Sequence, residues 1–166
     1  MKNYFLVTLF LLVSLPSLSQ VLEGRVQIEG FPNGKNLEES IPVDLFKSFK
    51  ENKYKIKFSY KASDIGKRGL VLFHMKTTVM RDGKSIHQSS RENWPWLPGD
   101  MYVPIEAFDL IPALQNEVYE MPVPRLDFPK LDTNLPKGTY SVKLEMIPVG
   151  GIKGKIAPAE FSFRIE

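Results

Sequence analysis

The stretch Lys53-Tyr54-Lys55-Ile56-Lys57-Phe58-Ser59-Tyr60-Lys61 (KYKIKFSYK) places lysine or serine at every second position, with tyrosine, isoleucine or phenylalanine between them. This period of two is typical of a β-strand with one face in water and one face buried. Strands of a parallel sheet covered on both sides show continuous apolar runs instead. The stretch therefore predicts an antiparallel strand whose inner face packs on a second layer.

The same alternation recurs at Tyr140 to Met146 and at Phe161 to Ile165, and Leu70 to Met80 has the composition of a longer strand. With turn signals between them, about seven segments of the chain qualify as strands, a number typical of two-sheet folds. We therefore predict an all-β fold, an antiparallel immunoglobulin-like β-sandwich with one short helix.

A tight hairpin is expected after Leu70 to Met80, because Asp82-Gly83 suits a two-residue turn in which both residues need positive φ. Counting outward from the turn pairs positions across the two strands. The expected pairs are Arg81 with Lys84, Met80 with Ser85, Val79 with Ile86, and Thr78 with His87.

Three segments depart from the strand pattern. Pro104 to Ile111 has a proline at a possible first helical position and apolar residues at helical spacing, so we expect one or two helical turns that Pro112 ends or kinks. Met121 to Pro129 has three prolines and is expected to be an extended edge or crossover. Val149 to Gly154 is expected to connect a hairpin.

Residues 1 to 20 (MKNYFLVTLFLLVSLPSLSQ) have the layout of a secretory signal peptide, with an early lysine, an apolar run and small residues before the expected cleavage site. No apolar run approaches the roughly 20 residues that span a bilayer. We therefore expect a secreted or periplasmic protein, with residues 21 to 166 forming a single domain and no integral membrane span.

Composition excludes several kinds of chemistry. Without Lys2, 21 basic residues stand against 19 acidic ones, a net charge of +2 that is too small to indicate nucleic-acid binding. The chain has no cysteine, and hence no disulfide and no thiol nucleophile. His74 and Met75 point to opposite faces of a strand, so a copper ion shared with Met80 and His87 would require a bulge or a broken strand. We expect no enzyme activity, no cofactor and no metal.

Both tryptophans lie in Arg91 to Asp100 (RENWPWLPGD), together with two prolines. Because proline lacks an N–H donor, this segment cannot be a central strand, and its aromatic residues should lie in a loop or at the end of a sheet. Two interpretations remain open. The tryptophans either cap a closed core or line the mouth of an apolar cavity.

Three stretches resemble the C-terminal part of the ML lipid-recognition superfamily, which includes the ganglioside activator and the Niemann-Pick-type sterol carriers. They are Tyr119 to Pro124 (YEMPVP), Leu135 to Glu145 (LPKGTYSVKLE) and Phe161 to Ile165 (FSFRI). The resemblance implies a secreted sandwich whose sheets part to admit a lipid, with Trp94 to Phe108 at the entrance. The side chains that it would place around the lipid are Phe58, Tyr60, Tyr140, Val142, Leu144, Phe161 and Phe163.

The functional hypothesis is thus a non-enzymatic protein that holds a lipid or another hydrophobic ligand in a cavity between two sheets. The alternative is an exported protein-protein interaction module, such as an envelope assembly component or a protease inhibitor, that uses the loop from Trp94 to Trp96. The candidate ligand-binding residues are Trp94, Trp96, Met101, Phe108, Phe58, Tyr60, Tyr140, Leu144 and Phe161.

Overall fold

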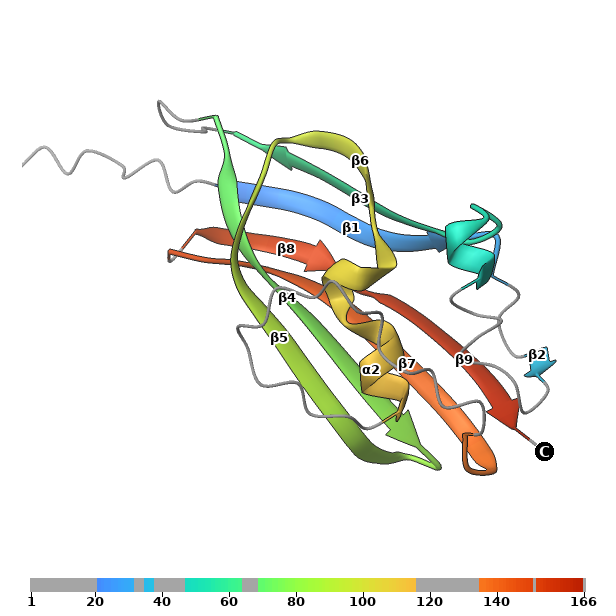
Figure 1. Ribbon diagram of the computed structural model, residues 1–166. Helices are drawn as coiled ribbons and strands as arrows, with labels where there is room; N and C mark the ends of the chain where they lie inside the picture. The colour runs from blue at the N-terminus through green and yellow to red at the C-terminus, as the bar shows by residue number, and fades with distance from the viewer. Residues whose placement is uncertain are drawn as a thin grey trace, which may run out of the picture.

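A computed structural model describes residues 21–31, 35–37, 47–63, 69–115, 135–150 and 152–165 (Figure 1). The expected signal peptide, the extended segment Met121 to Pro129 and the Tyr119 to Pro124 part of the resemblance lie outside these residues.

The strands form two sheets that pack face to face, so the predicted all-β sandwich is confirmed. The four-stranded sheet has the order β6 (Gly99–Val103), β3 (Lys55–Ala62), β1 (Val21–Glu29) and β8 (Lys153–Ala157). The five-stranded sheet has the order β2 (Lys35–Leu37), β9 (Ala159–Ile165), β7 (Gly138–Pro148), β4 (Val71–Arg81) and β5 (Lys84–Trp96). Neighbouring strands are antiparallel except in the pairs β1–β8 and β2–β9.

The alternation that predicted β3 is reproduced in its burial. Ile56, Phe58 and Tyr60 are buried, while Lys55 and Lys57 are only partly covered. The rings of Phe58 and Tyr60 each lie 5.1 Å from the ring of Phe73 on β4. Because β3 and β4 belong to different sheets, these contacts join the two layers directly.

The β4–β5 hairpin confirms half of the expected pairing. Arg81 faces Lys84 and Met80 faces Ser85, but Val79 faces His87 and Thr78 faces Gln88. The register shifts between Val79 and Met80 because β5 carries one extra residue there. Such a bulge cannot be counted from the turn, since it depends on how the strand bends to follow its partner.

The predicted helical segment is split into η1 (Ile105–Phe108) and α2 (Leu110–Gln115), with Asp109 between them at a left-handed φ of 49°. Pro104 occupies the N-cap position just before η1, and its carbonyl accepts a 3.0 Å hydrogen bond from the Ala107 N–H. The expectation that Pro112 ends or kinks the helix was wrong. Pro112 is the third residue of α2, within the first turn, where backbone N–H groups have no acceptor inside the helix.

The helices complete the core where the four-stranded sheet does not cover it. Both η1 and α2 contact β4 and β5. The hydroxyl of the buried Thr77 on β4 donates a hydrogen bond to the carbonyl of Phe108, and Leu110, Ala113 and Leu114 are buried. No helix among the described residues is long and apolar enough to cross a membrane. The inner face of the five-stranded sheet is therefore covered partly by strands and partly by helix.

Two connections cross between the sheets at the same end of the molecule (Figure 1). Leu97 and Pro98 lead from β5 to β6, and residues 149–152 lead from β7 to β8. The second connection was expected to be a hairpin, which was wrong, because β8 pairs with β1 and not with β7. The prediction that the tryptophan segment is no central strand is confirmed, since β5 is an edge strand.

Candidate functional site

Three of the nine candidate residues gather near the end where the sheets are connected. Phe58 stacks on Tyr60 with ring centroids 5.1 Å apart, and Trp96 meets Phe58 edge-on at 6.2 Å. The Tyr60 hydroxyl donates a 2.7 Å hydrogen bond to the carbonyl of Trp96, and burial raises the pKa of Tyr60 to about 12. These rings and Phe73 fill the space between β3 and β4.

Three other candidates, Tyr140, Leu144 and Phe161, are buried on the inner face of the five-stranded sheet. Tyr140 lies parallel to Phe163 with ring centroids 5.1 Å apart, and its hydroxyl donates a hydrogen bond to the carbonyl of Pro136. Phe161 contacts Phe31, with centroids 4.7 Å apart. Tyr140 and Phe161 are therefore packed against rings of the protein itself.

The remaining candidates, Trp94, Met101 and Phe108, differ in how deeply they are buried. Phe108 is in the core, Met101 is partly buried opposite Phe58, and Trp94 is 41% exposed. The two tryptophans therefore differ, because Trp96 packs on the core while Trp94 stands at the edge of the sheet. The position of Trp96 agrees with the interpretation in which the tryptophans cap a closed core, and not with the mouth of a cavity.

An ion pair beside Trp94 fixes the junction between η1 and α2. The Arg91 guanidinium lies 6.0 Å from the Trp94 ring and donates two hydrogen bonds to the Asp109 carboxylate, that of Nε being 2.8 Å long. The Asp109 carboxylate also raises the pKa of Arg91. This two-point contact ties the helical segment to β5.

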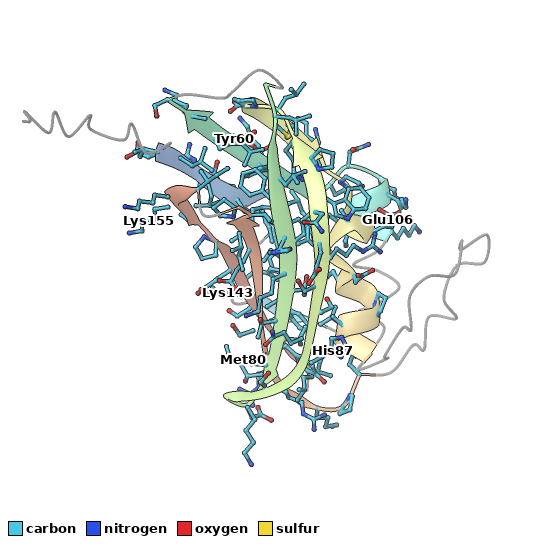
Figure 2. All side chains as sticks on the ribbon, turned by 90° about the vertical axis from the view of Figure 1, so that its left-hand side faces the viewer. Tyr60, Met80, His87, Glu106, Lys143 and Lys155 are labelled. Carbon is cyan, nitrogen blue, oxygen red and sulfur yellow. The ribbon has the colours of Figure 1, made fainter. Side chains whose placement is uncertain are left out.

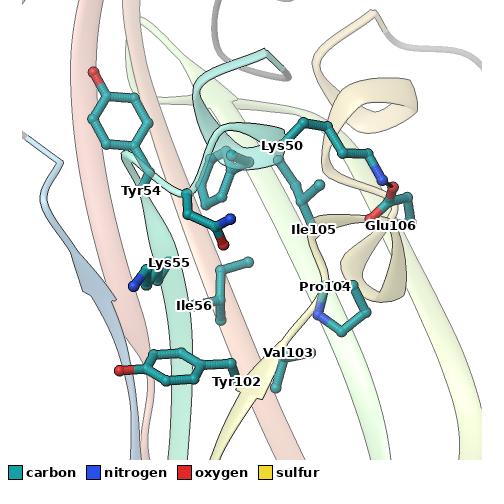
Figure 3. A pocket seen from close by; sticks show the side chains of 11 residues that line it. Lys50, Tyr54, Lys55, Ile56, Tyr102, Val103, Pro104, Ile105 and Glu106 are labelled. Atoms are coloured by element: carbon teal, nitrogen blue, oxygen red, sulfur yellow. Dashed lines mark hydrogen bonds and ion pairs between the residues drawn. The ribbon is translucent and has the colours of Figure 1, made fainter.

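A pocket of about 380 Å³ opens on another side, where β3, β6, η1 and residues 47–54 meet (Figure 3). We call it the β3–β6 pocket. Its floor consists of the buried side chains Phe49, Ile56, Val103 and Ile105. Its other lining residues are Lys50, Asn52, Tyr54, Lys55, Tyr102, Pro104 and Glu106.

Charged groups surround the apolar floor of this pocket. Lys50 and Glu106 form an ion pair across the rim, and the Lys55 ammonium lies 5.4 Å from the centre of the Tyr102 ring. Tyr102 is 59% exposed. The arrangement can remove the apolar part of a molecule from water while its polar part stays at the rim.

None of the nine candidate residues lines the β3–β6 pocket. Two residues of its floor belong to patterns that the sequence showed, Ile56 to the alternating strand and Ile105 to the helical segment. Neither pattern says that the two residues meet, because about fifty positions separate them along the chain.

The described residues offer no ready metal site. No group of three or more histidine, aspartate or glutamate side chains there could hold a metal ion. The register places His87 opposite Val79, five positions along β4 from His74, which corresponds to roughly 16 Å at about 3.3 Å per residue.

Compared with models of known families, with curated proteins and with solved structures, the chain shows no match.

Proposed function

We propose that this protein binds a hydrophobic ligand without catalysis and that the β3–β6 pocket receives the ligand's apolar part. One observation supports the proposal. A pocket of about 380 Å³ has a floor of buried apolar side chains that continues into the core. Its size falls within the range of about 300 to 1,000 Å³ that is common for small-molecule sites.

The physical basis of binding is desolvation. Each Å² of apolar surface removed from water contributes roughly 25 cal/mol, from which the loss of ligand freedom must be subtracted. The floor residues are already held by the core, so little of the pocket needs to be ordered on binding. The Lys50–Glu106 pair and the Lys55 ammonium provide polar partners at the rim.

The ligand class agrees with the resemblance to lipid-recognition domains, whereas the position of the site is different. Phe58 and Tyr60 contact Phe73 across the two sheets, so we place the ligand beside β6 rather than between these strands. Export to a secreted or periplasmic location, where a soluble carrier could meet lipids, belongs to the same proposal.

The test uses the chain from residue 21, purified and titrated with a fluorescent fatty acid. Tyr102→Ala removes an exposed wall of the pocket and should weaken binding by about tenfold, since an aromatic side chain buries a large area. Trp94→Ala is the matched control, because Trp94 is a half-exposed aromatic residue outside the pocket. Absence of binding, or equal losses in the two variants, would contradict the proposal.

A further inference from the structure

Exposed apolar side chains concentrate at one end of the sandwich. Of the seven large hydrophobic residues exposed in the described part of the chain, six lie where β1, β4 and β8 begin and where β5 and β7 end (Figure 1). We call this group the apolar end. It consists of Val21, Leu70, Leu72, Trp94, Leu97 and Ile147.

The strand register shows that several of these residues share a surface. Leu72 lies opposite Pro95 on β5, and Ile147 on β7 lies opposite His74, the next outward-facing residue of β4 after Leu72. Because directly paired residues of antiparallel strands project to the same face, Leu72, Pro95 and Ile147 lie on the outer face of the five-stranded sheet, whereas Trp94, paired with the buried Phe73, projects to the other side of β5. Leu97, which is 63% exposed, continues this surface into the connection to β6.

Exposed lysines neighbour Val21, the member of the apolar end on the outer face of the four-stranded sheet. Val21 pairs with Lys153, and Glu23 lies between Lys61 and Lys155 in the register. The three lysines are exposed, and no carboxylate among the described residues lies within ion-pairing distance of them. With Glu23 counted, these groups carry a net charge of +2. In Figure 2, Lys155 is labelled at the left edge of the molecule, away from the β4–β5 turn near which Met80 and His87 are labelled.

We propose that the apolar end binds the surface of a lipid bilayer with anionic headgroups. Leucine side chains would enter the boundary of the acyl chains, Trp94 would lie at the headgroup level, and the lysines would meet the anionic groups. The residues occupy strand ends and a connection rather than the walls of a pocket. Such an arrangement fits a fluid surface better than a partner with one fixed shape.

Sedimentation with vesicles tests this proposal. Vesicles of phosphatidylcholine mixed with phosphatidylglycerol should carry the protein into the pellet, whereas vesicles of phosphatidylcholine alone should bind it at least about tenfold more weakly. Binding should decrease as salt is added, because the ions screen the lysines. No binding to the mixed vesicles would overturn the proposal and direct attention to a protein partner of the apolar end.

Two double variants locate the contact. Leu72→Asp with Leu97→Asp should reduce vesicle binding by more than about tenfold, since both side chains leave water in the bound state. Lys153→Glu with Lys155→Glu should reduce binding to the mixed vesicles only. Circular dichroism confirms that each variant is folded, because unfolded chains also bind lipid.

The control for charge is Lys84→Glu with Lys137→Glu, which changes the net charge equally at the opposite end, near the β4–β5 turn. It should bind vesicles like the unchanged protein, and equal losses in both lysine variants would overturn the proposed location. Tyr102→Ala should also leave vesicle binding unchanged. The apolar-end variants should still bind the fluorescent fatty acid, so failure of this proposal and failure of the pocket are separable.

Discussion

The Tyr60 hydroxyl donates a hydrogen bond to the backbone carbonyl of Trp96, and this contact joins the inner strand β3 to the end of the edge strand β5 in the other sheet. It also holds the end of β5 at Trp96 against the core, although Pro95 and Pro98 lie on either side of that residue. Trp96 is the last residue of β5 and pairs with Val71 on β4, and the buried phenol donates to its carbonyl from the other sheet.

Burial of the same tyrosine predicts a steeper loss of stability at alkaline pH. The pKa of Tyr60 is raised from 10.0 to about 12 in the folded protein. The stabilisation that the protonated Tyr60 gives the folded protein is therefore fully present below pH 10. It decreases as the pH rises toward 12, because the unfolded chain releases the proton first. Tyr60→Phe should lower the free energy of unfolding by about 1 kcal/mol at pH 8. It should also flatten the decline of this free energy between pH 10 and 12, which urea unfolding at both ends of this range would measure.

Tyr102→Phe is the control for that experiment, since Tyr102 is exposed. It should keep the alkaline decline of the unchanged protein. Parallel declines in Tyr60→Phe and in the unchanged protein would show that another group causes the loss.

The helical segment depends on one buried hydroxyl. Thr77 is fully buried and donates to the carbonyl of Phe108. Thr77→Val keeps the shape but removes the donor, so the free energy of unfolding should fall by about 1 to 3 kcal/mol. Thr78→Val, one position along on the outer face, should change it by less than about 0.5 kcal/mol in the same denaturant titration. Equal effects would mean that the hydrogen bond does not matter.

The Arg91–Asp109 pair should show measurable coupling. Both side chains are about a quarter exposed or less, and two parallel hydrogen bonds join them. A double-mutant cycle with Arg91→Gln and Asp109→Asn should give a coupling energy of about 1 kcal/mol in thermal or urea unfolding. Asparagine is chosen because it tolerates the left-handed φ of Asp109.

The comparison cycle uses Lys57→Gln and Asp100→Asn. The Lys57 Nζ and Asp100 Oδ2 atoms lie 2.8 Å apart, but the Asp100 side chain is 66% exposed. The coupling of this pair should be indistinguishable from zero, because water and salt screen exposed charges. Coupling of similar size in the two cycles would contradict the role given to burial.

Gly24 allows β1 and β3 to approach closely. A Cβ added there would lie 2.6 Å from the Cβ of Tyr60 and 2.9 Å from a methyl group of Ile156. Gly24→Ala should therefore lower the free energy of unfolding by at least about 2 kcal/mol, through overpacking at the inner face. Gly83→Ala, at a turn with open space but a φ of 77°, should cost only about 1 kcal/mol. The reverse order in urea unfolding would refute the steric argument.

The strands could be predicted because their signals are local. The alternation from Lys53 to Lys61 and the Asp82-Gly83 turn each involve neighbours in the chain, and the structure contains the corresponding strands and turn. The sequence patterns did not single out β1, β6 and β8 as strands. Gly24 and Gly154 interrupt the alternation of β1 and β8, and β6 has only five residues.

The sequence by itself determined that this chain forms two half-buried sheets without disulfides, because side-chain alternation and the lack of cysteine are properties of the chain alone. The tertiary structure decided which sheet receives β8, where β5 bulges, and how Ile56 meets Ile105 in a pocket. It also decided that exposed leucines from separate strands share one end. The physical reason is that these features depend on packing between segments far apart in the chain, for which a local pattern contains no information.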